Sequence, residues 1–253
     1  MKERPGKWAR PGAIALWLAV SFLTSGALAV PISGQGTWES TFKARDIDGN
    51  AVELNAANAT FFYDTALDIT WLRDWNVNGA HDWNSQVAWA AGLTVGNFSG
   101  WRLPKNNDDD HDGCVFSVNG FPGDCGYNVD PATSEMAHLF YVTLDNLAFC
   151  PPTDTLFCTD PQAGWGLSNT AQFLNMQDDG YWSGTDFENP PGPRAWDFSL
   201  NGGGQGRDGK ERVLYAVAVR PGDVAAAVPE PSSLALLLAG LGALAAVRRL
   251  RSH

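Results

Sequence analysis

An apolar segment at each end of the 253-residue chain confines the folded domain to the residues between them. Residues 13–29 follow four basic side chains and end in an Ala-Leu-Ala motif, which is typical of a cleaved secretory signal peptide. Residues 232–250 are long enough, at about 1.5 Å of rise per residue, to cross the hydrocarbon core of a membrane. We therefore expect a signal helix in residues 1–29, an exported domain in residues 30–224 and a C-terminal segment in residues 225–253.

The C-terminal segment has three parts: a tag (residues 228–231), an apolar run (residues 232–247) and a basic tail (residues 248–253). Pro229 and Pro231 flank Glu230 and keep the tag extended, as a protease cleft requires. The arginines of the tail predict that this end stays cytoplasmic. A plain membrane anchor and a buried apolar helix are the alternatives, and the Pro-Glu-Pro spacing favours a sorting signal.

This segment resembles the PEP-CTERM sorting signal of Gram-negative bacteria. The resemblance implies that an exosortase, an integral-membrane cysteine protease, recognises Pro229-Glu230-Pro231 and processes the protein. It also implies export across the inner membrane and transient anchoring through a C-terminal transmembrane helix. The processed protein would then lie at the cell surface or outside the cell.

The exported part of the chain is strongly acidic. The whole chain has 17 basic and 28 acidic residues, and without the seven basic and two acidic residues of its ends, 10 and 26 remain, a net charge of −16. Such a domain repels nucleic acid and anionic lipid and attracts cations or basic partners. We therefore expect no nucleic-acid partner.

The composition of this part predicts one globular domain held by disulfides. About 200 residues suffice for a single core, and nine tryptophans argue against disorder. Four cysteines in an exported chain predict disulfides, with three connectivities open, of which the local pairs Cys114–Cys125 and Cys150–Cys158 are the simplest. No Cys-x-x-Cys or nearby histidine spacing favours a metal site at these cysteines.

Hydrophobic patterns predict an α+β fold with two helices. The helices are expected at residues 82–93, capped by Asp82 or Asn84, and at residues 133–145, capped by Thr133 or Ser134. A hairpin with an Asp48-Gly49 turn is expected in residues 38–54. Further strands are expected at residues 60–64, 69–72, 181–185, 194–200 and 213–220, with a mobile, glycine-rich hairpin tip at residues 201–204.

Three groups of residues resemble the Lcl-type C-terminal domain family, named for the end domain of bacterial collagen-like adhesins: residues 99–104 (Ser-Gly-Trp-Arg-Leu-Pro), residues 181–185 (Tyr-Trp-Ser-Gly-Thr), and Ala195-Trp196 with residues 217–220. The resemblance covers about residues 64–221. It implies a C-type lectin-like fold, with two helices and a looped, mostly antiparallel sheet, in which Trp101 is buried and Arg102 ties strands together. Some adhesins of this kind bind sulfated glycans, a property that a net charge of −16 opposes.

One acidic loop gives the sharpest local signal for a bound ion. Asp108, Asp110 and Asp112 precede a glycine in the D-x-D-x-D-G order that begins a calcium loop. Asn119 stands where an EF-hand has its closing glutamate, so calcium would need help from Asp124, Asp130 or backbone carbonyls. A solvated acidic loop is the alternative, and the repulsion between neighbouring aspartates favours calcium as a cofactor.

Loop tryptophans are the candidates for stacking on sugar rings. Trp75, Trp83 and Trp165 lie in or near predicted loops, and core packing is the alternative role for each. The sequence contains no nucleophile elbow, zinc-protease or P-loop motif, so we expect no enzyme. A hidden pair of carboxylates for glycoside hydrolysis is the alternative.

Together these features indicate an exported cell-surface or matrix protein that is sorted by an exosortase. Its domain is expected to be a non-catalytic module that binds exopolysaccharide, another surface glycan or a protein, in connection with biofilm. A secreted carbohydrate-active enzyme using Asp/Glu catalysis and a purely structural acidic surface protein are the alternatives.

Overall fold

The computed structural model describes residues 30–106, 113–117, 123–152, 158, 160–187 and 193–225. The predicted signal peptide, the sorting tag and apolar run, and the aspartates Asp108, Asp110 and Asp112 lie outside the described residues. The described chain is a mixed α/β structure with two antiparallel sheets and few helices. Within these ranges, no helix is both long and apolar enough to cross a membrane.

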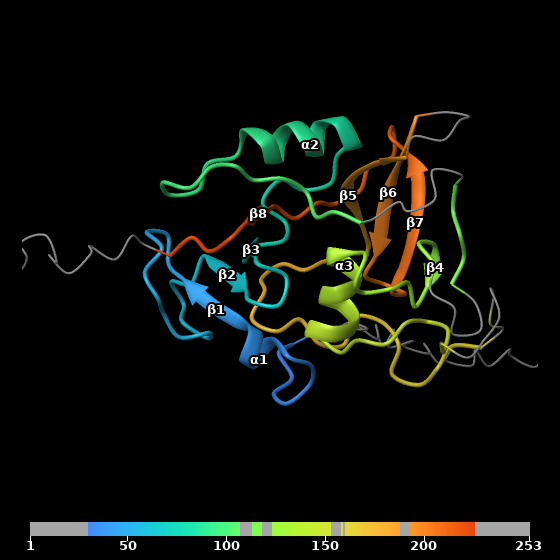
Figure 1. Cartoon of the computed structure of the whole chain (residues 1–253), viewed down its shortest axis with the longest axis horizontal. Coiled ribbons are helices and arrows are strands. Elements are labelled where there is room, and N and C mark those ends of the chain that lie inside the picture. Colours follow the sequence, from blue (N-terminus) through green and yellow to red (C-terminus); the bar gives the residue numbers. More distant parts are fainter. Residues whose placement is uncertain are drawn as a thin grey trace, which may run out of the picture.

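The first sheet brings together the two ends of the described chain (Figure 1). Its strands are β1 (Phe42–Arg45), β2 (Phe61–Asp64), β3 (Ile69–Leu72) and β8 (Val219–Pro221), adjacent in that order and antiparallel. Aromatic and β-branched side chains suit this pleated, half-buried surface. β2 and β3 confirm the strands predicted there.

The predicted hairpin of residues 38–54 is confirmed at its turn, where Arg45 and Ala51 form an antiparallel bridge, but it is much shorter than predicted. Residues Trp38–Thr41 form a helical turn, α1, and β1 pairs with β2. The Asp46 carboxylate accepts hydrogen bonds from the backbone N–H groups of Asp48 and Asn50, at 3.0 and 2.8 Å. Asp46 therefore makes a tight turn after β1, and the returning chain donates the Val52 N–H to the Ala44 carbonyl at 3.2 Å before it continues as loop.

The second sheet has the order β4 (Gly126–Tyr127), β7 (Gly204–Gly209), β6 (Arg194–Ser199) and β5 (Gly180–Phe187). β5 and β6 confirm two predicted strands, whereas β7 was not predicted because its sequence, Gly-Gln-Gly-Arg-Asp-Gly, has low strand propensity. The tip that joins β6 to β7 is buried at Gly202 and Gly203. Gly203 has φ of +66°, and a Cβ there would lie 2.6 Å from the Phe140 ring, so only glycine fits.

Two helices lie where the sequence predicts them. Helix α2 (Trp83–Gly92) begins at Asp82, whose carboxylate accepts the Ser85 N–H at 3.1 Å. Helix α3 (Glu135–His138) is capped by Ser134 and continues directly as a π-helix, η1 (Leu139–Thr143). The second prediction is therefore confirmed in position and differs in helix type.

The main core lies between the two sheets, where α3 and η1 are placed (Figure 1). It collects Phe42, Phe62 and Trp71 from the first sheet, Tyr181 and Phe198 from the second, and Met136 and Phe140 from the helical segment. Helix α2 covers a second cluster that includes Ala90, Leu103 and Trp182. One core shared by both sheets makes the described chain a single domain.

The Trp-Arg-Leu-Pro segment goes beyond its predicted role in one respect. Trp101 is buried and stacks on Phe61 at 5.5 Å between ring centroids, as predicted. The Arg102 backbone pairs with Val219 of β8 through two hydrogen bonds of 2.8 Å, whereas its side chain makes two hydrogen bonds of 2.7 Å to Glu135 and so ties this segment to the start of α3 as well. The glutamate also accepts the Lys105 N–H at 2.7 Å, which fixes it at the helix N-terminus.

The predicted alternation in residues 213–220 is wrong. Val213 is 64% exposed, whereas Leu214 and the four residues from Ala216 to Val219 are all buried. This segment passes between the two sheets and meets apolar side chains on both sides, so a period of two does not apply.

Candidate ligand-binding surface

Trp165 is the exposed member of the three tryptophans that the sequence proposes for sugar stacking. Trp75 is fully buried and stacks on Trp71 at 5.7 Å. Trp83 is half-buried, donates its indole N–H to the Ser183 carbonyl at 2.8 Å, and carries Lys210 4.4 Å above its ring. Trp165 is 38% exposed, so its ring has surface to offer a ligand.

Trp165 begins a row of three aromatic rings. Its ring meets Phe149 edge-on at 4.7 Å, and Phe149 in turn stacks on Tyr127 at 5.8 Å. The loop that carries Trp165 is tied to the segment before Cys150 by two backbone hydrogen bonds, Gly166 N to Leu147 O and Gln162 N to Phe149 O, of 2.9 and 3.0 Å. The indole is therefore held in place by its neighbours and by the backbone.

A depression of about 340 Å³ lies in the same two segments. Leu147, Ala148 and Gln162 belong to its lining, and Leu147 also bridges to Trp165 and is 42% exposed. The other lining residues are Asn128, Val129, Tyr141, Asp145, Asn146 and Pro152. This volume is at the small end of ligand-binding cavities, and the mixture of apolar wall and amide groups suits a small polar ligand.

Two of the five described non-glycine residues with positive φ line this depression. Asn128 and Asp145 have φ of +56° and +52°, a region that non-glycine residues rarely occupy and that Asn and Asp tolerate best. The π-helix η1 leads directly into the lining, and it carries Tyr141. π-Helices and left-handed residues cost stability and are found preferentially at functional sites.

Buried hydrogen bonds hold these conformations. The Tyr141 hydroxyl donates to the Gly203 carbonyl and accepts the Asn128 N–H at 2.9 Å. Burial raises the pKa of Tyr141, so the hydroxyl stays protonated. The side-chain amide oxygen of Asn146 (Oδ1) accepts hydrogen bonds from Ser168 N, Ser168 Oγ and Asn169 N, at 3.1, 2.9 and 2.8 Å. The floor of the depression is therefore rigid before any ligand arrives.

Both disulfides have the local pairing expected from the sequence. Cys150 and Cys158 are joined, with 5.6 Å between their Cα atoms, and close the loop that contains Pro152 of the depression. Cys114 and Cys125 are joined in the other loop, with 5.4 Å between their Cα atoms. A disulfide limits the conformations open to each loop, and the first one ties Cys158 to Cys150, the residue that follows Phe149 of the aromatic row.

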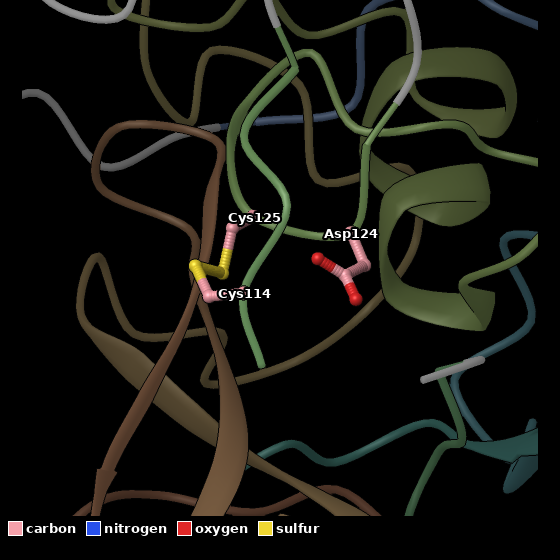
Figure 2. A group of neighbouring side chains, drawn as sticks. All are labelled: Cys114, Asp124 and Cys125. Carbon is pink, nitrogen blue, oxygen red and sulfur yellow. A yellow bond between two sulfur atoms is a disulfide. The ribbon is translucent and has the colours of Figure 1, made fainter. Parts of the chain in front are cut away.

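The cluster of Cys114, Cys125 and Asp124 has the residue types of a metal site but not the chemistry of one. Figure 2 shows the two sulfurs bonded to each other with the Asp124 carboxylate beside them. Disulfide sulfurs are not thiolates and do not serve as metal ligands. Asp124 accepts the Val115 N–H at 2.7 Å and so connects the two segments that the disulfide joins, whereas Asp130 accepts the Ala132 N–H at 2.8 Å within its own turn.

A second feature is a partly buried carboxyl group in the middle of the second sheet. Asp197 lies on β6, opposite Trp182 and Gly206 of the flanking strands. The pKa of Asp197 is raised to about 7, chiefly by burial and also by the nearby Asp208, while Arg212 acts in the opposite direction. A carboxyl group with this pKa holds a proton near neutral pH and has the chemistry of a general acid.

A shallow cavity of about 370 Å³ lies near the start of α2. Its lining is polar and includes Asp82 and Lys210, and Lys210 is engaged by an ion pair with Asp186 at 2.7 Å and by the Trp83 ring. Because its one lysine is already engaged and no exposed aromatic ring joins the lining, this cavity is the weaker candidate.

Comparison with known proteins assigns the C-terminal segment. Residues 227–252 match the PEP-CTERM protein-sorting motif. The chain therefore carries the sorting motif of exported, exosortase-processed surface proteins, with a C-terminal membrane anchor before processing. No curated protein and no solved structure matches the chain.

Most of the candidate surface was missed by reasoning from the sequence. The sequence patterns indicate Trp165 as a candidate for sugar stacking, but they do not indicate Tyr127, Phe149, Asn128 or Asp145. Their only local signal is an Asn or Asp next to an aromatic or apolar residue in a loop beside a cysteine. Such a signal is too common to predict a site, since the residues meet through the fold.

Proposed function

We propose that the protein is a cell-surface or matrix component of a Gram-negative bacterium whose exported domain binds glycans through the aromatic row and the depression beside it. The exposed ring of Trp165 carries this proposal, because an indole face matches the apolar face of a pyranose. The sorting motif supports it, since export brings the domain to extracellular polysaccharide and biofilm.

A C-type lectin-like fold is part of the same proposal. Three observations support it: the last strand, β8, returns to the sheet of the first strands; α2 and the α3–η1 segment precede strands β5, β6 and β7 of the second sheet; and two disulfides close loops between these elements. In such a domain the sheets supply a rigid frame and the loops supply binding.

A glycan array probed with the purified exported protein tests the proposal. We expect binding to a subset of glycans and a loss of about fivefold for Trp165→Ala, since one stacked ring contributes on the order of 1 kcal/mol. Phe116→Ala is the matched control, because Phe116 is exposed to a similar fraction, 42%, in the loop closed by the other disulfide. Equal binding by wild type and Trp165→Ala, or no glycan bound with or without calcium, would contradict the proposal.

Calcium binding at Asp108, Asp110 and Asp112 is a separate proposal. The alternate spacing of the aspartates supports it, and the disulfide between Cys114 and Cys125 limits the loop that follows them. Titration calorimetry should show calcium binding that Asp110→Ala removes. No heat of calcium binding to the wild-type protein would contradict this calcium site.

One observation favours a second function, that of a secreted glycoside hydrolase. Asp197 and Asp208 lie on adjacent strands, and the first has a raised pKa, which is the arrangement that separates acid and base roles in such enzymes. Release of reducing sugar from a bound polysaccharide, abolished by Asp197→Asn, would establish it. Unchanged polysaccharide after prolonged incubation would leave the binding function alone.

A further inference from the structure

We infer that the depression beside Trp165 selects saccharides that donate hydrogen bonds and carry no sulfate or carboxylate. This inference rests on the proposed function and adds the chemical class of the ligand. It follows from which side-chain donors and acceptors of the lining are already used within the protein.

The side-chain donor groups of the lining are committed to the protein itself. The Tyr141 hydroxyl donates to the Gly203 carbonyl, and the Asn128 amide donates to the Cys150 carbonyl at 2.9 Å. The Gln162 amide donates to the carbonyls of Ala148 and Cys150, at 2.6 and 3.2 Å. The Asn146 amide donates to the Asn169 carbonyl at 2.9 Å and is buried. Two side-chain amide hydrogens are then left, one on Asn128 and one on Asn146, and the latter belongs to a residue that is only 1% exposed.

The lining offers a ligand more free acceptor atoms than free donor hydrogens. Within the described residues, the amide oxygens of Asn128 and Gln162 and the carboxylate of Asp145 accept no hydrogen bond from the protein. An amide oxygen and an ionised carboxylate can accept hydrogen bonds but cannot donate them. A ligand that satisfies these atoms must bring hydroxyl, N–H or ammonium hydrogens.

The charge of the lining also favours a neutral ligand over an anionic one. Among the described residues that line it, Asp145 is the one carboxylic acid and none is a lysine or arginine, and the exported chain has a net charge of −16. A sulfate or uronate group would therefore meet a carboxylate and bare amide oxygens, and like charges at short range repel. Neutral hydroxyls meet the same atoms as partners.

Asp145 makes the inference testable without disturbing the fold. Asp145→Asn replaces a carboxylate by an amide of the same shape, and Asn tolerates the left-handed backbone that this position requires, φ +52°. The variant removes the negative charge and adds an N–H donor while the aromatic row stays intact.

The experiment measures affinities for paired neutral and sulfated oligosaccharides of glucose, galactose and mannose by calorimetry with the exported protein. We expect neutral members to bind at least about tenfold more tightly than their sulfated partners, a discrimination typical of one unmatched polar contact. In Asp145→Asn the gap should narrow severalfold, whereas Trp165→Ala should weaken all members that bind.

The outcomes separate the inference from the proposed function. Sulfated members that bind as well as neutral ones, in a manner that Trp165→Ala abolishes, would overturn the inferred class and leave glycan binding in place. A neutral preference that Asp145→Asn leaves unchanged would also overturn the inference. No binding by any pair would contradict glycan binding itself.

Discussion

Replacing Asp197 by Asn should remove a pH dependence from the stability of the domain. The pKa of Asp197 is raised from 3.8 to about 7, chiefly by burial. Between these two pH values the folded protein holds a proton that the unfolded chain has released. Because the folded state then binds more protons, the free energy of unfolding falls as pH rises. The stability that the protonated Asp197 carboxyl contributes is fully present below about pH 4 and is lost as the pH rises through about 7.

The magnitude follows from the size of the shift. A difference of about three pKa units at about 1.36 kcal/mol per unit gives a ceiling of about 4 kcal/mol for the stability lost across this range. Asp197→Asn keeps the shape of the side chain and cannot ionise. We therefore expect the variant to match the wild type near pH 4 and to exceed it by up to about 4 kcal/mol near pH 8.

Urea unfolding of the exported protein, with disulfides intact, measures both curves from about pH 4 to about pH 8. Other carboxyls with raised pKa, such as the buried Asp64 and the exposed Asp178, act equally in both proteins and cancel in the difference. Asp208→Asn is the control, because it removes the neighbouring charge and should move the transition to lower pH without abolishing it. Parallel curves for wild type and Asp197→Asn would show that folding does not raise the pKa of Asp197.

Three further changes test the frame around the candidate surface. Glu135→Gln should destabilise the domain by about 1–3 kcal/mol in urea unfolding, because it breaks the paired hydrogen bonds to Arg102. An unchanged free energy of unfolding would show that the Arg102–Glu135 pair does not stabilise the domain. Removing the second disulfide by Cys150→Ser with Cys158→Ser should cost about 2.5 kcal/mol in thermal or urea unfolding, given a separation of 8 residues. The same double variant should also lose affinity for saccharide, and full affinity would exclude a positioning role. Asp82→Ala should cost about 1 kcal/mol through loss of the α2 cap, and an unchanged midpoint would contradict the capping role.

Local signals of the sequence were enough for the elements that depend on local physics. Asp82 and Ser134 cap their helices as predicted, and the aromatic runs of β2 and β3 form strands. The cysteine pairs are the local ones. In each case the determining contact lies within a few residues, so the sequence pattern and the structure report the same interaction.

Elements that depend on distant contacts were not predictable. β7 is a strand because β6 pairs with it along its whole length, against the propensity of its glycines. The tip at Gly203 packs on Phe140, more than sixty residues away, although its glycines predicted mobility. The same holds for the candidate surface, because Tyr127, Phe149 and Trp165 become neighbours only after the sheets and loops have assembled.

The glycan-binding account is tested most directly by the indole N–H resonances of the exported protein during titration with a neutral oligosaccharide. The exported chain has nine tryptophans, and Trp165→Phe identifies the Trp165 resonance by its disappearance. The account predicts that this resonance shifts as ligand is added while that of the fully buried Trp75 stays in place. Shifts confined to other indoles, with the Trp165 resonance unmoved, would contradict it.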